Sequence, residues 1–188
     1  MPAPAAMEQW ISTFLEAQAA EADAARNTRL AYGRDLLDFA GWLTGHAQDF
    51  ASVAREGVED YIIWCEAQGL AKATRARRLS AIRQLFRFAH DEGWRADNPA
   101  IRISGPGATK RLPKTLSLDE VNRLLDAART KGRTAGERLR NRALMELLYA
   151  TGMRVSELVG LPVAAARGEP KMILVRGKGG KERMVPLS

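Results

Sequence analysis

The sequence predicts a mainly α-helical protein in two parts, with an irregular basic segment between them and a β-hairpin in the second part. Apolar residues recur at spacings of three and four through the first ninety-odd residues and again between residues 117 and 159. This is the period of an amphipathic helix. Two strand-like runs, 171–176 and 182–187, flank a glycine-rich turn. We therefore expect a helical domain over residues 1–93, a linker over 94–114 and an α+β part over 115–188.

Four helices account for the first part, and we expect them at about 7–20, 27–45, 58–68 and 72–90. Asn27 or Thr28 suits the start of the second helix, while Gly45 and Gly69 suit helix ends. Their inward apolar residues are expected to be Trp10, Ile11, Phe14, Leu15, Leu30, Leu36, Leu37, Phe39, Trp42, Tyr61, Ile62, Cys65, Leu79, Ile82, Leu85, Phe86 and Ala89. These residues form an apolar stripe on each helix, and we expect the four stripes to pack together into a small helical bundle.

The segment from Gly93 to Lys114 is rich in proline and glycine, which discourages both helix and strand. It carries five basic residues against the single acid Asp97; the basic residues are Arg95, Arg102, Lys110, Arg111 and Lys114. We expect a basic linker that can wrap around a partner.

The second part opens with a capping box from Ser117 to Glu120, in which each side chain satisfies a free amide at the helix start. A longer helix is expected over 137–149, ending at Gly152, and a short helix over 155–159. The inward residues of the longer helix are expected to be Leu139, Ala143, Leu144, Leu147 and Leu148.

Charge is distributed unevenly along the chain. Residues 1–60 carry 4 Lys and Arg against 10 Asp and Glu, whereas residues 61–188 carry 25 against 12. With a pI near 10.0, this asymmetry indicates a polyanionic partner, most often nucleic acid. A solvated basic surface explains the composition alone equally well.

Several classes of function are excluded by what the sequence contains. With one cysteine, Cys65, and only His46 and His90, neither a disulfide framework nor a Cys/His metal site is expected. No apolar run approaches the ~20 residues that span a bilayer, and residues 1–6 do not resemble a secretion signal. We expect a cytoplasmic protein with no membrane partner and no small-molecule substrate.

The fourth helix is strongly basic, with no acidic residue between positions 72 and 90. Its basic residues are Lys72, Arg75, Arg77, Arg78, Arg83 and Arg87. A solubilising face usually mixes both signs of charge, so we predict contacts with a DNA or RNA backbone. A purely solvated face is the alternative.

Two short segments carry candidate catalytic residues. Arg154 follows the Gly152 helix end, with Glu157 three residues later; alone, this spacing fits an ordinary surface ion pair. Lys178 lies in the turn 177–181, which is not a nucleotide-binding P-loop because Glu182, rather than Ser or Thr, follows Lys181. The turn is either a basic hairpin tip that contacts phosphate or a merely exposed loop.

Together, residues 147–161 and 177–187 closely resemble the tyrosine recombinase (phage integrase) family, most closely its bacterial Xer branch. Residues 28–36 and 98–100 extend the resemblance into the first part. The resemblance implies a four-helix, SAM-like core-binding domain followed by the first part of an α+β catalytic domain with one hairpin.

The implied activity is site-specific recombination of double-stranded DNA through a 3′-phosphotyrosyl intermediate, without metal or other cofactor, by subunits that form a tetramer on DNA. Arg154 matches the family's first catalytic arginine and Lys178 its hairpin lysine, the candidate general acid. Glu157 matches an acidic residue that supports the arginine. We add Lys110, Arg111, Lys181 and Arg183 as further DNA contacts.

This sequence departs from the family pattern in two places. Residues 162–170 lack the aromatic residue and aspartate that commonly follow the arginine, which leaves the local packing open. The family's His-x-x-Arg box and nucleophilic tyrosine lie beyond the hairpin and do not occur in these 188 residues. We therefore expect that this chain alone does not cut DNA. The alternatives are a non-catalytic DNA-binding protein or inhibitor derived from a recombinase, and an RNA-binding protein.

Overall fold

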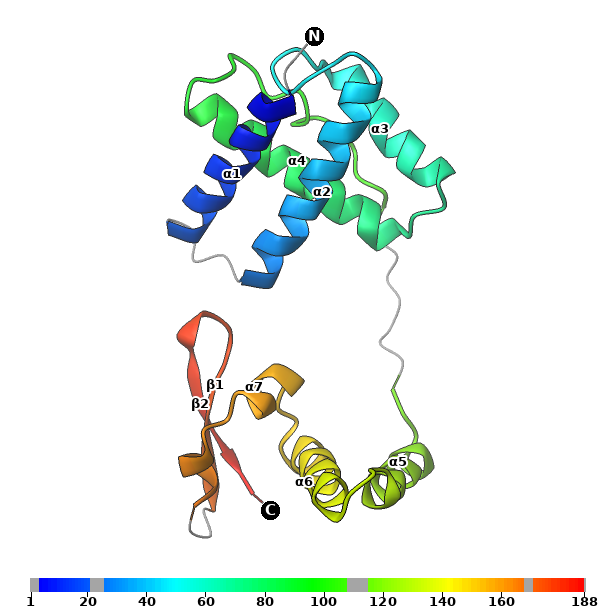
Figure 1. The fold of residues 1–188 in the computed structure, drawn as a ribbon, viewed down its shortest axis with the longest axis vertical. Coiled ribbons are helices and arrows are strands. Elements are labelled where there is room, and N and C mark those ends of the chain that lie inside the picture. Colours follow the sequence, from blue (N-terminus) through cyan, green and yellow to red (C-terminus); the bar gives the residue numbers. More distant parts are fainter. Residues whose placement is uncertain (1–3, 21–25, 108–114, 168–170, 188) are drawn as a thin grey trace. The chain divides into compact units, whose positions relative to one another are not determined.

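The chain folds into two units, Met1–Lys110 and Arg111–Ser188 (Figure 1). The computed structural model describes residues 4–20, 26–107, 115–167 and 171–187. The first unit consists of helices, and the second combines helices with a two-stranded antiparallel sheet. The mainly α-helical fold expected from the sequence is confirmed.

The first unit contains the four expected helices, α1 (Pro4–Ala20), α2 (Arg26–Gly45), α3 (Arg55–Ala67) and α4 (Lys72–Asp91). Their ends differ from the predicted ones by at most three residues. Helices α1 and α2 lie side by side, α4 packs against both, and α3 contacts α2 and α4 (Figure 1).

Aromatic residues form the centre of the first core. The Phe39 ring lies 4.7 Å from Tyr61, 5.8 Å from Phe50 and 6.4 Å from Phe86, measured between ring centroids. All four side chains are fully buried, and so is the Cys65 thiol. Two expected core residues are wrong: Leu30 is 53% exposed and Leu37 50% exposed. They lie on the same face of α2, since they are seven residues apart, and Leu37 is turned about 100° from the buried Leu36.

The beginning of the expected linker belongs to the first unit. Ala100 is fully buried and Ile103 is 5% exposed in the core of the helical bundle. The Arg95 guanidinium donates hydrogen bonds to the carbonyl oxygens of Phe50 (2.7 Å) and Ala51 (2.9 Å). Since these contacts are with the loop after α2, residues 95–103 complete the bundle.

The second unit contains α5 (Leu118–Thr130), α6 (Ala135–Thr151), α7 (Val155–Val159) and a 3₁₀ turn (Val163–Ala166). Strands β1 (Met172–Arg176) and β2 (Glu182–Pro186) form an antiparallel hairpin around a second 3₁₀ turn, η2 (Lys178–Gly180). The predicted capping box is confirmed, because the Glu120 amide donates to the Ser117 hydroxyl and the Ser117 amide donates to the Glu120 carboxylate.

The core of the second unit is small. Its buried residues come from α7, from the segment just before it and from the hairpin: Met153, Leu158, Ile173, Val175 and Val185. Leu144, Leu147 and Leu148 of α6 pack against them, as predicted. The inward placement predicted for Leu139 and Ala143 is wrong, since Leu139 is 68% exposed and Ala143 is also exposed. These residues lie in the first half of α6, away from the turns that contact this core.

Across the described ranges, no helix combines the length and apolar character needed to cross a membrane.

Candidate active site

Arg154 lies at the junction of two helices. Gly152 ends α6 in the left-handed conformation (φ 60°), and Met153, which follows, is buried. Arg154 then takes an extended conformation and becomes the N-cap of α7. Because Gly152 reverses the chain and Met153 is packed into the core, the backbone of Arg154 is fixed. Its side chain remains 71% exposed.

Glu157 fixes Arg154 from the first turn of α7. Its Oε2 accepts a hydrogen bond from the Arg154 backbone amide (2.8 Å), and its Oε1 accepts one from Arg154 Nη1 (3.0 Å). The first contact is half of a capping box; arginine has no side-chain acceptor to complete the other half. The Glu157 side chain is only 4% exposed. The supporting role expected for Glu157 fits this geometry.

The Arg183 side chain also binds Glu157. Arg183 Nη1 donates to Oε1 and Nη2 to Oε2, both at 2.8 Å, which is a bidentate pair. The antiparallel register places Arg183 opposite Val175, close to the turn of the hairpin. The sequence prediction gave Arg183 a DNA contact, whereas in the structure its guanidinium is engaged by a carboxylate within the unit.

Gly177 brings the hairpin turn next to the same carboxylate. A Cβ atom at this position would lie 3.1 Å from Glu157 Oε1 and 3.6 Å from Arg183 Nη1. The missing side chain therefore allows the backbone to approach the pair. Lys178 follows directly, so the structure brings the backbone of the candidate general acid beside the Arg154–Glu157–Arg183 cluster.

Hydrogen bonding keeps Glu157 ionised. The Arg183 guanidinium is the main cause, followed by the Arg154 backbone amide, and together they lower the pKa of Glu157 from 4.5 to about 2. The same pair raises the pKa of Arg183 above its ordinary value. At neutral pH the cluster therefore holds one negative and two positive side chains.

Four further residues were predicted for the site or for DNA contacts nearby: Lys178, Lys181, Lys110 and Arg111. Lys178 is the first residue of η2, and its side chain lies outside the described part of the structure. Lys181 is exposed just before β2. Lys110 and Arg111 lie outside the described residues. Within the described ranges, no group of three or more His, Cys, Asp and Glu side chains could hold a metal ion.

Three of the six basic residues of helix α4 are buried or half-buried and bind partners within the first unit. Arg75 Nη1 pairs with Glu66 Oε1 (2.7 Å), and its side chain is 8% exposed. Arg78 Nη1 donates to Asp38, to the Tyr61 hydroxyl (2.8 Å) and to the Cys65 sulfur (3.3 Å).

Arg83 is the third of these residues, and it donates to the carbonyl oxygens of Ala100 and Ile103. Arg75, Arg78 and Arg83 therefore hold the bundle together, and nothing in their geometry supports the predicted phosphate contact.

The other three basic residues of α4 face outward. Lys72 is exposed at the helix start, and the Arg87 side chain is 73% exposed with a 3.7 Å contact to Asp91. Arg77 is 44% exposed and also pairs with the buried Asp35, from Arg77 Nε to Asp35 Oδ2 at 3.0 Å. Burial raises the pKa of Asp35, while Arg77 and Arg78 oppose that rise.

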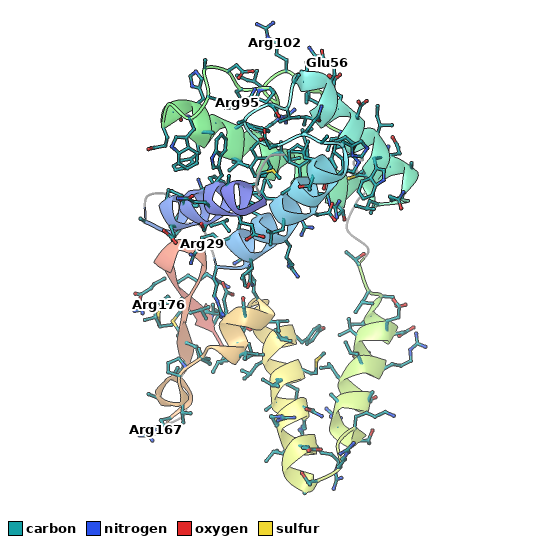
Figure 2. All side chains as sticks on the ribbon, turned by 45° about the horizontal axis from the view of Figure 1, so that its top comes forward. Arg29, Glu56, Arg95, Arg102, Arg167 and Arg176 are labelled. Atoms are coloured by element: carbon teal, nitrogen blue, oxygen red, sulfur yellow. The ribbon has the colours of Figure 1, made fainter. Side chains whose placement is uncertain are left out.

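Gln84, which the sequence prediction did not include, has an exposed side chain on α4 one turn from Arg87. Its amide carries both a donor and an acceptor, the combination that reads adenine in the major groove. Its position between two basic residues of a predicted nucleic-acid helix could have drawn attention to it. Among the residues of the expected linker, Arg102 is exposed and points away from the bundle (Figure 2).

Comparison with known proteins adds an independent line of evidence. Residues 11–93 match the family model described as phage integrase, N-terminal SAM-like domain, and residues 114–188 match the phage integrase family model. The tyrosine recombinase XerD of Caulobacter vibrioides is 47% identical over 181 residues, covering 96% of this chain and 59% of the relative. XerD of Brucella suis is 48% identical over 184 residues, covering 95% and 60%.

The chain thus spans about three fifths of the length of these curated relatives. Among solved structures, a lambda integrase tetramer bound to a Holliday junction matches with a TM-score of 0.70 at 18% identity, over 95% of this chain and 49% of that one. At this identity the match concerns the fold alone. Together with the family models and the XerD relatives, it places this chain in the tyrosine recombinase (phage integrase) family, in its Xer-like branch.

Proposed function

We propose that this chain supplies the DNA-binding surface and part of the phosphate-activating site of a site-specific recombinase. The observation that carries the proposal is the fixed, exposed Arg154 guanidinium beside the buried Glu157 carboxylate. A planar guanidinium held in one place is suited to bidentate contact with a phosphate.

In the proposed reaction, the hydroxyl oxygen of the family's tyrosine gives up its proton to solvent and attacks a DNA phosphorus atom, and the bond from phosphorus to the 5′ oxygen breaks. Arg154 stabilises the negative charge that builds on the non-bridging oxygens during this step. Lys178 donates a proton to the departing 5′ oxygen, which leaves as a hydroxyl group. Neither role requires a metal ion or another cofactor.

The proposed duplex-binding surface is the outer side of α4. Lys72, Arg77 and Arg87 would contact phosphates there, which gives affinity without sequence choice. Gln84 lies between Arg77 and Arg87 along the helix and would contact base edges, which gives sequence choice. We further propose that several subunits assemble on DNA, since the lambda integrase neighbour is a tetramer on a Holliday junction. Action on chromosomal DNA would place the protein in the cytoplasm.

Binding is tested by titrating the 188-residue chain with duplex DNA and with structured RNA at the same salt concentrations. We expect the duplex to bind more tightly, with an affinity that falls steeply as salt rises because bound counterions are released. Equal or tighter binding of RNA would contradict the proposal.

Cleavage is tested in a chimera in which this chain replaces the matching part of the Caulobacter vibrioides XerD. On a nicked suicide substrate, the chimera is expected to form a covalent protein–DNA adduct. An Arg154→Ala chimera should bind the substrate with unchanged affinity but form the adduct at least about 10²-fold more slowly. Equal adduct formation by both chimeras would remove Arg154 from the active site.

A further inference from the structure

The two arginines that share Glu157 differ in exposure and in geometry. Arg183 makes two hydrogen bonds to the carboxylate and is 41% exposed, whereas the Arg154 side chain makes one and is 71% exposed. We infer that Arg183 is a positioning residue that holds and neutralises Glu157, so that Arg154 keeps its charge available for a phosphate. The inference rests on the proposed function, because it assigns the phosphate to Arg154.

Charge balance is the first argument for this role. A pair of Arg154 and Glu157 alone has no net charge and attracts a phosphate weakly. Arg183 adds a second positive charge at 2.8 Å from both carboxylate oxygens, which leaves the cluster with a net charge of +1. Glu157 can then fix the Arg154 backbone without cancelling the charge that Arg154 presents.

Geometry is the second argument. Glu157 accepts hydrogen bonds from the Arg154 amide and from both guanidinium groups, so its two oxygens are fully used. Arg183 reaches Glu157 from β2 and Arg154 reaches it from the start of α7, so the carboxylate ties the hairpin to the helix. A carboxylate held from two elements cannot turn away and release Arg154.

The hairpin also offers a matched control. Arg176 lies on β1, opposite Glu182, and its side chain pairs with that residue at 2.7 Å while remaining 77% exposed. Figure 2 labels Arg176 on the hairpin. Arg176 and Glu157 line the same cavity, but no hydrogen bond or ion pair joins them. Removing Arg176 therefore changes the charge beside the site by one unit without removing a contact of Glu157.

The test uses the 188-residue chain and inorganic phosphate, and follows the Arg154 Nε–Hε signal by NMR at low ionic strength. The variants are Arg183→Met, Glu157→Gln with Arg183→Met, Arg183→Gln, and the control Arg176→Met. The amide signals of Val175 and Val185 report whether the second unit is folded in each variant, since both side chains lie in its core.

We expect Arg183→Met to weaken phosphate binding about tenfold, because Glu157 then cancels the charge of Arg154. The double variant should bind within about twofold of the wild type, because the neutral amide of Gln no longer cancels that charge. If Arg183 served only to stabilise the fold, the double variant would not recover phosphate binding. Arg176→Met should change the affinity by less than about twofold.

Three results would overturn the inference: no phosphate response of Arg154 in the wild type, unchanged binding in a folded Arg183→Met variant, or a double variant as weak as the single one. If Arg183→Met does not fold, Arg183→Gln decides, since it keeps a hydrogen-bond donor beside Glu157 but removes the charge, and should weaken binding about tenfold in the same way. Unchanged binding in that variant would likewise overturn the inference. None of these readouts uses DNA or cleavage. A failure of the proposed recombinase function therefore shows up separately, in the DNA titration and in the chimera.

Discussion

Arginine serves different purposes at neighbouring positions of α4. Arg78 binds Asp38, the Tyr61 hydroxyl and the Cys65 sulfur inside the bundle. Arg83 satisfies two carbonyl groups of the segment after the helix. Arg87, one turn further, is exposed. The partner that each guanidinium reaches, rather than its angle on the helix, separates the structural residues Arg78 and Arg83 from Arg87, which we propose contacts DNA.

Replacing Arg83 and Arg87 separately tests this distinction. Arg83→Ala leaves the carbonyl groups of Ala100 and Ile103 without their donor, and we expect the first unit to lose about 2 kcal/mol of unfolding free energy. Arg87→Ala removes only a loose surface pair with Asp91, so the unfolding free energy of the first unit should change by less than about 0.5 kcal/mol in this variant. Denaturant unfolding followed by tryptophan fluorescence measures both, because all four tryptophans lie between residues 10 and 94. Equal losses would contradict the assignment.

Glu157 makes the second unit sensitive to acid. Its pKa is about 2 in the folded protein against an ordinary value of 4.5, so its contribution to stability is complete above pH 4.5 and is lost as the pH falls through 2. We expect Glu157→Gln to be less stable than the wild type at neutral pH, with a difference that shrinks between pH 4.5 and 2. Hydrogen exchange at Val175 and Val185 measures this.

The difference between the two proteins isolates Glu157 from other acidic groups of the unit. Hydrogen bonds also lower the pKa of Glu120, at the Ser117 cap, and that of Glu146, beside Arg142. Both remain in the variant, so their titration cancels in the comparison. A stability difference that stays constant down to pH 2 would show that Glu157 is not held ionised by its partners.

At the scale of the helix, the turn before Arg154 depends on backbone conformation. Gly152 has φ 60°, and a Cβ there would meet no atom within 4 Å. The expected cost of Gly152→Ala is therefore backbone strain alone, about 1 kcal/mol. Gly41→Ala, inside α2 and equally free of contacts, should instead stabilise its unit by up to about 1 kcal/mol. Hydrogen exchange in each unit measures both, and equal effects would argue against the strain explanation.

Secondary structure could be predicted from the sequence because it depends on local signals. Gly152, the Ser117 capping box and the apolar period of α4 each act within a few residues, and each was confirmed. Burial was harder to predict, because the apolar pattern of a helix does not reveal whether another helix or strand packs on its apolar face. Leu37 and Leu139 continue apolar stripes, yet both are at least half exposed because nothing in their unit packs on them.

The side-chain partners in the site could be predicted only in part. Arg154 and Glu157 are three residues apart, so their pairing follows from helix geometry. Arg183 lies 26 residues from Glu157, and its contact depends on the hairpin register and on the space that Gly177 leaves. No local pattern contains that information, which is why Arg183 was assigned to DNA.

For the whole molecule, the strongest feature is the contrast between an acidic first third and a basic remainder. Pairing with a carboxylate does not separate the residues proposed to bind DNA from the others, because Arg77 and Arg87 of α4 pair with Asp35 and Asp91. Arg55 with Glu59 on α3 and Arg142 with Glu146 on α6 are paired in the same way but lie on other helices. Position, rather than net charge, should therefore decide duplex binding.

Two triple variants with the same loss of charge separate these possibilities. The first replaces Lys72, Arg77 and Arg87 of α4 by alanine, and the second replaces Arg55, Arg129 and Arg142, each of which pairs with an acidic residue. The slope of log affinity against log salt should fall by about 0.9 for each lost phosphate contact, or nearly three units in the first variant. In the second variant it should change by less than about one unit. Equal changes in both would mean that net charge alone binds the duplex, and the α4 surface would then lose its assignment.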